Sequence, residues 1–386
     1  MSYNVLRSNT LDSKGEKIVG DEIRIGVIGV GLIGKSHLKK YAEVPGAKVV
    51  AVSDLNIDEA QRVAAEYKIP VAYKNFQELL AQADIDAVDV CLHNNLHAPI
   101  GIAAMNADKH VYCEKPMAGS FADSFAMYDA SQRTGKKLHI QIGTLYTHEH
   151  RNALRLIEAG ALGKIHYARS FGFRRRGRAY VDGYGTPPFT QKAQAGGGAL
   201  FDMGVYHIAE ILHLLNNPTV ETISGATHQE LPMYEERAKH SRYDVEELGL
   251  GFVRLAGGIT LSIEESWAMH YDDTESSKIL GSLGGIKLNP FTFFTTVADV
   301  ELNCAADPVW LSGYRRNQCY PEHLANEHSQ SHWIAALQGK TALWNTAGVA
   351  LNTSLISEGI YQSQTLKKEL TAQEVREISK STALKI

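Results

Sequence analysis

The segment from Ile23 to Gly34, IRIGVIGVGLIG, constrains the fold of this chain more than any other. An apolar, β-branched run leads into three glycines, and SHLKKYAEV after them has the pattern of a helix. Glycine permits a tight turn, close approach of the backbone to a pyrophosphate, and close packing of helix on strand. The helix N-terminus adds free N–H groups and a partial positive charge. We therefore predict a dinucleotide-binding turn made by Gly29, Gly31, Leu32, Ile33 and Gly34.

An acidic residue at the end of the next apolar run indicates which dinucleotide is bound. Asp54 ends AKVVAVSD and follows Gly34 by 20 residues. A carboxylate there accepts hydrogen bonds from both ribose hydroxyls and repels a 2′-phosphate. No arginine follows Asp54 directly. The pattern favours NAD as the cofactor over NADP.

Strand and helix patterns alternate through the first part of the chain and then give way to a different order. The alternation with short connections predicts a parallel, doubly wound sheet with helices on both faces. After about residue 143, alternating runs separated by Gly, Pro and Asn predict an antiparallel sheet, interrupted by a helical segment at 196–215. We predict an α/β fold with a polar extension at 1–22, a dinucleotide-binding domain at 23–145 and a C-terminal α+β domain at 146–386.

Composition excludes several classes of function. The chain has 386 residues, 44% hydrophobic and 21% charged, with a formal net charge of −4, so we expect no nucleic-acid partner. No apolar run is long enough to cross a membrane, and the polar N-terminus does not resemble a secretory leader. Four cysteines without CxxC spacing, at 91, 113, 304 and 319, indicate reduced thiols in a cytoplasmic protein. Glu322-His323 and Glu327-His328 form no tight ligand motif, and we expect no metal.

The stretch VYCEKPMA places Glu114, Lys115 and Pro116 at the carboxyl end of a predicted parallel strand. Ligands of open α/β sheets bind beyond that end. Proline restricts the residue before it to extended conformations, which aims the Lys115 side chain. A lysine beside a nicotinamide and a sugar hydroxyl can bind the reacting oxygen or move its proton. The ordinary alternative is a solvated surface lysine.

Several motifs together resemble the Gfo/Idh/MocA oxidoreductase family in order and spacing. They are the glycine turn, Asp54, CLHNNLHAPI, HVYCEKPMA, IEAGALGKI and GGGALFDMGVYHIAEIL. The resemblance implies an N-terminal Rossmann domain and a C-terminal domain whose open sheet serves oligomerisation, so a homodimer or homotetramer is expected. It implies that Lys115 is catalytic and that Glu114 contacts the cofactor. It places Asn94, Leu96 and His97 in the loop beside the nicotinamide ribose, although His97 also suits a hydrogen-bonded loop histidine.

The chain departs from the family at its proton-transfer motif. Many members read D-x-G-x-H, with Asp and His four residues apart on one helical face. Here Tyr206 stands four residues after Asp202, and His207 follows one residue later, about 100° around a regular helix. We therefore prefer Tyr206 as the catalytic partner of Asp202 and expect the Lys115 cation to lower its pKa. His207 is the rival base, because its usual pKa suits the task better.

A basic, aromatic segment, FRRRGRAYVDGYGTPPF, is the candidate substrate loop. On a strand, Arg174 and Arg176 would share one face and bind sugar hydroxyls or a carboxylate. Tyr184 and Trp267 are candidates to stack on a pyranose. Tyr146 stands where the family commonly has an arginine, and we include it among the candidate substrate contacts.

These residues predict an NAD-dependent oxidoreductase acting on a secondary hydroxyl, or the corresponding ketone, of a sugar, polyol or cyclitol. One alternative is an NAD-dependent glycoside hydrolase of the same family, which oxidises a ring carbon, eliminates the substituent and returns the hydride. A second is a non-catalytic sensor of NAD or sugar. Lys115 and Tyr206 argue against the sensor, which needs neither.

Overall fold

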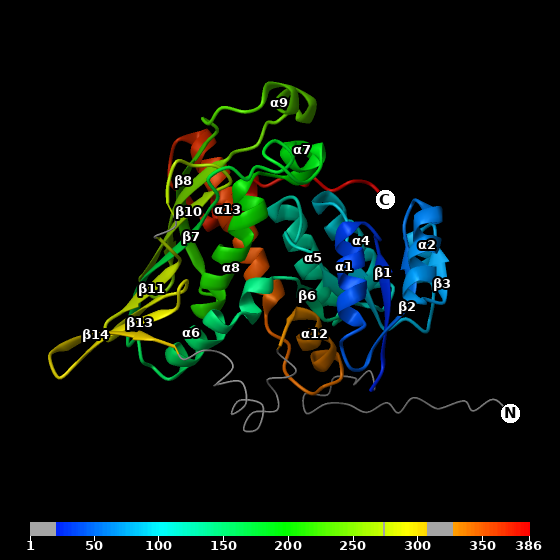
Figure 1. Ribbon diagram of the computed structural model, residues 1–386, viewed down its shortest axis with the longest axis horizontal. Helices are drawn as coiled ribbons and strands as arrows, with labels where there is room; N and C mark the ends of the chain where they lie inside the picture. The colour runs from blue at the N-terminus through cyan, green and yellow to red at the C-terminus, as the bar shows by residue number, and fades with distance from the viewer. Residues whose placement is uncertain (1–20, 273–274, 307–326) are drawn as a thin grey trace.

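The computed structural model describes residues 21–272, 275–306 and 327–386. Cys319, Glu322, His323 and nearly all of the 1–22 extension lie outside these ranges. The described chain builds two sheets that lie side by side with helices between them (Figure 1).

The first sheet has six parallel strands in the order β3-β2-β1-β4-β5-β6, as the alternating pattern predicts. Ile23, Ile25 and Val27 of β1 are fully buried because helices cover both faces. The strands are β1 (Ile23–Ile28), β2 (Ala47–Ser53), β3 (Val71–Tyr73), β4 (Ala87–Val90), β5 (His110–Cys113) and β6 (Leu138–Ile140).

Asn56 and Ser120 cap two of the helices of this half with their side chains. Asn56 caps its helix by accepting a hydrogen bond from the Glu59 N–H at 3.2 Å. The helices are α1 (Leu32–Tyr41), α2 (Ile57–Tyr67), α3 (Phe76–Leu80), α4 (Asn94–Asn106) and α5 (Phe121–Thr134). Helix α4 begins at Asn94, so Asn94, Leu96 and His97 lie in a helical first turn instead of the expected loop. Proline at position 99 lies inside this helix, as its sixth residue, where it removes one backbone hydrogen bond.

The second sheet has nine strands in the order β14-β13-β12-β11-β7-β10-β9-β8-β15. Neighbours are antiparallel except β7 and β10, which run parallel. The hairpin of β13 and β14 was not predicted, because all six residues of β14 are exposed and give no alternating pattern. The strands are β7 (Ile165–Phe173), β8 (Val220–His228), β9 (Leu248–Leu255), β10 (Ile259–Ser266), β11 (Lys278–Gly281), β12 (Gly284–Lys287), β13 (Thr292–Val297), β14 (Val300–Ala305) and β15 (Leu370–Thr371).

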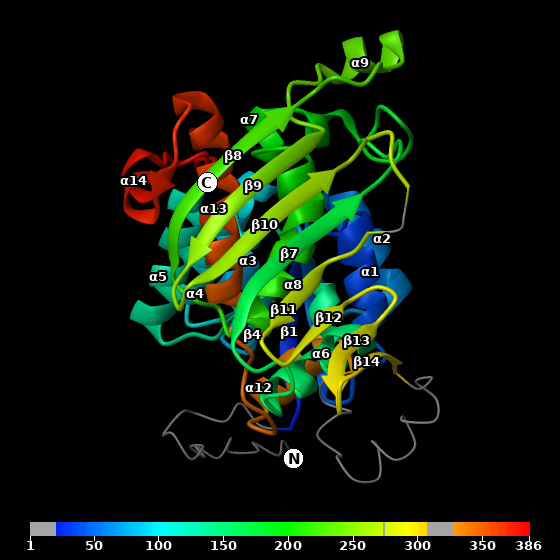
Figure 2. The same cartoon turned by 90° about the vertical axis from the view of Figure 1, so that its left-hand side faces the viewer.

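Within the part of the chain that the structure describes, helices cover only one face of the second sheet, and its other face is open (Figure 2). The open face carries Arg169 between two glutamates, Glu264 and Glu275, at 2.7 and 2.6 Å. It also carries exposed large apolar side chains, among them Phe252, Phe294 and Leu280 at 44%, 38% and 36%. The helices of this part are α6 (His148–Glu158), α7 (Lys192–Ala195), α8 (Val205–Leu214), α9 (Glu235–Ser241), α13 (Thr346–Leu366) and α14 (Ala372–Ile378).

One C-terminal helix, α12 (Ser329–Leu337), returns to the first sheet. Its Trp333, Ile334 and Leu337 are buried in the same apolar cluster as Ile23 and Ile25 of β1. Residues late in the sequence therefore complete the core of the dinucleotide-binding half.

The helical segment predicted at 196–215 contains an irregular turn. Residues Leu200–Gly204 form a π-helical turn that leads directly into α8. A π-helical turn is closed by an i→i+5 hydrogen bond and therefore contains about one residue more than an α-helical turn. Asp202 lies within this turn, whereas Tyr206 and His207 lie in α8 just beyond it, so the regular α-helical spacing that the prediction assumed does not hold between them.

Candidate active site

The glycine turn between β1 and α1 has the geometry that the sequence predicts. Gly29 has φ of +95°, and a Cβ there would lie 2.4 Å from the Cys91 carbonyl oxygen. A Cβ on Gly34 would lie 2.1 Å from the Gly29 carbonyl oxygen, whereas one on Gly31 would meet nothing within 4 Å. Leu32 and Ile33 begin α1 and are 86% and 45% exposed. The open space at Gly31 and the free helix start fit the pyrophosphate of a dinucleotide.

Asp54 directly follows β2 and is held by the backbone. Its Oδ2 accepts a hydrogen bond from the Val30 N–H at 3.0 Å, and its Oδ1 accepts one from the Asn56 N–H at 2.9 Å. These bonds fix the carboxylate next to the glycine turn. This is the place from which a carboxylate meets the adenosine ribose of a bound dinucleotide.

Lys115 lies just past the end of β5 and reaches residues from the other half of the molecule. Its Nζ donates to the Asp202 Oδ1 and to the Asp202 carbonyl oxygen, both at 3.0 Å. The same Nζ lies 4.6 Å from the centre of the Tyr206 ring. The structure thus brings Lys115, Asp202 and Tyr206 together across 87 residues of sequence, as predicted.

Asp202 is fixed from a second direction by Trp267. The Trp267 Nε1–H donates to the Asp202 Oδ2 at 3.1 Å, and the indole is 1% exposed. A ring buried on all sides has no open face for a pyranose, so the prediction that Trp267 stacks on substrate is wrong. Its contribution to the site is to orient Asp202.

The start of the π-helical turn is held by a buried glutamate that the sequence did not reveal. Glu246 accepts hydrogen bonds from the Gly198 and Leu200 N–H groups at 2.8 and 2.9 Å and from the Tyr361 hydroxyl at 2.8 Å. Glu246 precedes β9 and lies far from this turn in sequence, so no spacing rule connects them. These bonds fix the start of the turn that carries Asp202 to Lys115.

Charge pairing governs the protonation of this group. Burial disfavours the charge on Lys115, but Asp202, Tyr206 and Glu114 outweigh it and raise the lysine pKa. Burial also opposes the charge on Asp202, and Lys115 outweighs it and lowers the carboxyl pKa. For Tyr206 the balance is reversed: burial raises the phenol pKa by more than Lys115 lowers it. Lys115 thus lowers the Tyr206 pKa as predicted, but burial outweighs its effect and the net shift is upward.

His207 has its own carboxylate partner in the second sheet. Its Nδ1 lies 2.8 Å from the Oε2 of Glu265, a fully buried residue of β10. Burial lowers the His207 pKa, but Glu265 outweighs it and the pKa is raised. The Nδ1–Glu265 bond leaves Nε2 as the ring nitrogen for other partners. Sequence spacing gave no sign of Glu265.

The residues matched to the nicotinamide-ribose loop have protein partners of their own. The buried His97 bridges the Pro116 and Leu92 carbonyl oxygens at 2.7 and 3.0 Å, and burial lowers its pKa. It ties the turn after β4 to the turn that carries Lys115. The Asn94 amide donates to the Ala195 carbonyl oxygen at 2.8 Å, and Leu96 packs against the core.

The candidate substrate loop is not a strand where it was predicted to be. Strand β7 ends at Phe173, so Arg174 and Arg176 lie in the loop beyond it and do not share a strand face. Arg174 donates to the hydroxyl of the exposed Tyr184 at 3.0 Å, and its charge lowers the pKa of both Asp202 and His207. Arg176 instead pairs with Asp182 at 3.4 Å.

The fourth arginine of this segment, Arg178, is buried and was not singled out from the sequence. Its guanidinium binds Asp182 and Glu247 at 2.6 and 2.8 Å and the Leu231 carbonyl oxygen at 3.1 Å. These bonds fix the loop that carries Arg174 and Tyr184.

Tyr146 lies in a packed aromatic cluster. It is 5% exposed, stacks on Trp344 at 5.0 Å and lies 3.3 Å from the His139 Nε2 through its hydroxyl. The structure gives it a packing role and does not join it to the group around Lys115.

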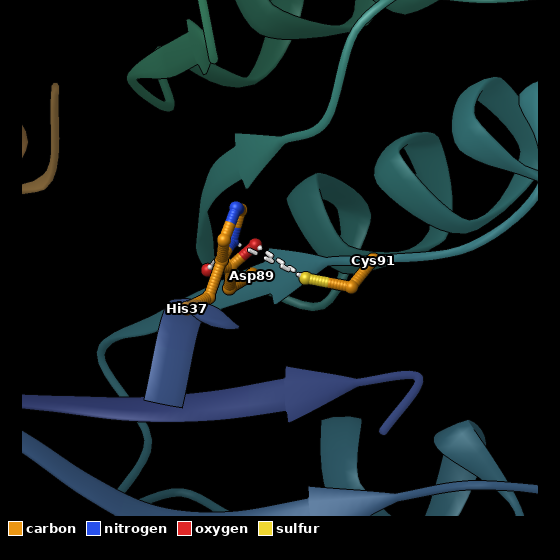
Figure 3. A group of neighbouring side chains, drawn as sticks. All are labelled: His37, Asp89 and Cys91. Atoms are coloured by element: carbon orange, nitrogen blue, oxygen red, sulfur yellow. Dashed lines mark hydrogen bonds and ion pairs between the residues drawn. The ribbon is translucent and has the colours of Figure 1, made fainter. Parts of the chain in front are cut away.

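Within the described ranges, one set of three potential metal ligands comes together: His37, Asp89 and Cys91 (Figure 3). Their polar atoms bind one another, with Nδ1 to Oδ2 at 2.8 Å and Sγ to Oδ1 at 3.2 Å. These are hydrogen-bond separations, and they leave the three groups satisfied without an ion. In the same described ranges, no helix combines the length and apolarity needed to cross a membrane.

Comparison with known proteins gives consistent matches along most of the chain. Residues 23–142 match the model of an oxidoreductase family with an NAD-binding Rossmann fold, and residues 150–287 match the Gfo/Idh/MocA C-terminal domain. A D-glucoside 3-dehydrogenase of Escherichia coli is 26% identical over 71% of this chain and 79% of its own. An inositol 2-dehydrogenase of Salmonella typhimurium is 30% identical over 52% of this chain and 56% of its own.

Solved structures show the same fold. A levoglucosan dehydrogenase in complex with NADH and levoglucosan superposes with a TM-score of 0.76, at 21% identity, over 91% of this chain and 99% of its own. An oxidoreductase from Klebsiella pneumoniae described as NAD-binding gives a TM-score of 0.76 at 20% identity, over 92% and 99%.

Proposed function

Because the chain belongs to the Gfo/Idh/MocA oxidoreductases, whose N-terminal domain is an NAD-binding Rossmann fold, we propose that it oxidises a secondary hydroxyl of a sugar, polyol or cyclitol, or reduces the matching ketone. The observation that carries the proposal is the contact of Lys115 with Asp202 and Tyr206. This contact places a cation and a phenol between the end of the parallel sheet and the second domain. Bound NAD supplies the hydride acceptor of such a reaction.

Lys115 and Tyr206 handle the proton in this proposal. Both groups hold their protons tightly, so they are suited to donate hydrogen bonds to a substrate oxygen as negative charge develops on it. Asp202, fixed by Trp267, holds the Lys115 ammonium in place. In reduction this group donates a proton to the substrate oxygen. In oxidation, Lys115 or Tyr206 first releases its proton to solvent and then accepts the proton of the substrate hydroxyl.

The pair of His207 and Glu265 supports a second assignment of the base. A histidine whose Nδ1 binds a buried carboxylate presents Nε2 in a fixed orientation. The π-helical turn that contains Asp202 departs from the regular helix spacing that favoured Tyr206 over this residue. We retain Tyr206 as the preferred partner because it contacts Lys115 directly.

The substrate class follows from the relatives and from the loop after β7. The matched relatives are described as dehydrogenases of a D-glucoside, inositol and levoglucosan, all of which offer several hydroxyls on a ring. Arg174 acts electrostatically on Asp202 and hydrogen-bonds the exposed Tyr184, and the two side chains supply hydrogen-bond donors and an aromatic face of the kind that sugars use.

The test is a panel of myo-inositol, levoglucosan and methyl or nitrophenyl D-glucosides, each with NAD and with NADP. We expect NADH to accumulate with at least one of them and NADP to be the poorer cofactor. Release of the nitrophenol without net NADH would favour the redox-neutral glycoside hydrolase. Binding of NAD and sugar without turnover of any panel member would favour a sensor.

We also propose that the boundary between the two domains lies between residues 145 and 146. We propose further that the chain forms a homo-oligomer through the open face of the second sheet and that the protein is cytoplasmic. The uncovered sheet supports the oligomer (Figure 2), and the free buried thiols of Cys91 and Cys113 support a reducing compartment. Light scattering at micromolar concentration tests the oligomer, and a monomer would contradict it.

A further inference from the structure

A buried histidine beneath the glycine turn touches two carboxylates at once. His37 lies on α1, with its Nδ1 2.8 Å from the Asp89 Oδ2 and its Nε2 2.9 Å from the Glu114 Oε1. His37 and Asp89 are 4% and 0% exposed, and Glu114 is 9% exposed. Figure 3 shows the histidine and Asp89 facing each other beside Cys91.

The ring carries a positive charge in this arrangement. Both ring nitrogens can donate to carboxylates only when the imidazole is protonated. Burial opposes that charge, but the attraction of Asp89 outweighs it and raises the pKa of His37. The histidine is thus a buried cation between two carboxylate groups. Because the place is enclosed, neither carboxylate could exchange its bond to the ring for a bond to water.

Glu114 connects His37 to Lys115. Its Oε1 is bound to His37, and its Oε2 accepts a hydrogen bond from the Lys115 backbone N–H at 3.1 Å. The Lys115 Nζ then binds Asp202. A continuous line of bonded groups therefore runs from the dinucleotide-binding half to the second domain.

The position of His37 on α1 connects the predicted cofactor site to Lys115. The N-terminus of the same helix is the predicted phosphate site, and His37 follows Gly34 by three residues. The helix that meets the cofactor is therefore bonded, through one imidazole, to the strand end that presents Lys115.

We propose that His37 is a positioning residue for the reaction, holding Glu114 in place so that the backbone at Lys115 and the lysine side chain keep their orientation toward the substrate. The proposal rests on the function proposed above for Lys115. Each oxygen of Glu114 has one partner within the protein, His37 for Oε1 and the Lys115 N–H for Oε2, and Glu114 supports the site through Lys115.

The charges that face the two ends of this line fix the direction of the expected pH effect. Asp202, Tyr206 and Glu114 face Lys115. His37, Lys115 and His97 face Glu114, and Asp89, Glu114 and Cys91 face His37. Without the imidazolium, Glu114 is buried near Asp89 with less compensation and takes up a proton. Less negative charge then faces Lys115 and Tyr206.

The test compares His37→Asn with His37→Gln. The asparagine amide occupies the place of Nδ1 and keeps the bond to Asp89, whereas the glutamine amide reaches the place of Nε2 and keeps the bond to Glu114. We expect His37→Asn to lower kcat by about tenfold or more and His37→Gln by less. We also expect the apparent pKa of kcat to fall by about one unit in His37→Asn. The control is Cys91→Ser, which alters the same cluster but not Glu114, and it should match wild type.

Two further measurements keep the test decisive. The ¹⁵N signals of the His37 ring, assigned with the variants, should show both nitrogens protonated from about pH 6 to about pH 9 without any substrate. Glu114→Gln is the substitute if a His37 variant does not fold. This variant keeps an acceptor for the Lys115 N–H and should shift the pH profile in the same direction. A loss of kcat at every pH without a shift, or a neutral His37 ring, would overturn the proposal. Failure of Lys115→Ala to reduce kcat would instead overturn the proposed function.

Discussion

The two halves of the candidate site are built in different ways. The cofactor half is local: Gly29, Gly31 and Gly34 lie within one turn, and Asp54 is held by the backbone of that turn. The substrate half is assembled from distant segments, because Asp202 meets Lys115 across 87 residues and Trp267 across 65. Changes in the first half should therefore alter which cofactor binds, and changes in the second should alter the rate.

The largest effect is expected at the contact that joins the two halves. Lys115→Ala removes the cation bound to Asp202 and should lower kcat by about 100- to 10,000-fold. The Kd for NADH, measured by fluorescence titration, should change little because the glycine turn and Asp54 are intact. A loss of NADH affinity as large as the loss of kcat would contradict the separation of the halves.

The next prediction separates the two candidate bases. Tyr206→Phe should lower kcat by about 100-fold or more, because the phenol contacts Lys115, and His207→Asn should cost less. Steady-state kinetics on the best substrate of the panel measures both. The reverse order would show that the π-helical turn presents His207, with Glu265 behind it, as the base.

The cofactor half is tested by Asp54→Ser. Removing this carboxylate should raise the ratio of kcat/KM for NADP to that for NAD by about tenfold or more, because the repulsion of the 2′-phosphate is lost. Asp58→Ser, which removes a carboxylate from the first turn of α2, is the matched control and should leave the ratio unchanged. A wild-type enzyme that already prefers NADP would show that Asp54 does not have this role.

The smallest effect concerns stability and involves the histidines of the second half. Burial lowers the pKa of both His150 and His213 to about 3, and their rings are 3.0 Å apart through Nε2 and Nδ1. The unfolded chain therefore binds more protons below pH 6.5, and the free energy of unfolding should fall as the pH drops from about 6.5 toward 3, by about 1.4 kcal/mol per unit and group. Glu210, with its pKa raised to about 7, opposes this trend between 4.5 and 7.

Urea unfolding at about pH 7.5 and about pH 5 measures the effect. His213→Gln should reduce the difference between the two conditions, and the exposed His166→Gln should not. An unfolding free energy that is the same at both pH values would contradict the assignment of neutral buried histidines.

The same contrast between the halves explains how far the sequence could predict the structure. The parallel sheet, the glycine turn and Asp54 follow from local patterns, and all were predicted from the residues. The contact of Lys115 with Asp202 and Tyr206 was predicted with the help of the family resemblance. In contrast, nothing in local spacing marks a π-helical turn, since its residues have the composition of an ordinary helix.

The residues that were missed act over long sequence distances. Glu246 and Glu265 bind groups 46 to 58 residues away, and Arg178 reaches Glu247 across 69 residues. Their role depends on which strands become neighbours in the second sheet, including the parallel pair of β7 and β10. Trp267 and Tyr146 were misassigned for the same reason, because their burial is set by tertiary packing and not by their neighbours in sequence.

Transfer of deuterium from substrate to cofactor tests the central claim most directly. myo-Inositol, levoglucosan or a methyl glucoside that is active in the panel is prepared with deuterium on its ring carbons and mixed with NAD, and the reduced cofactor is analysed by mass spectrometry. We predict one deuterium per NADH formed, and about 100-fold or slower transfer in Lys115→Ala at the same NAD occupancy. Transfer that is equally fast without the Lys115 side chain, or NADH without deuterium, would contradict the proposed reaction.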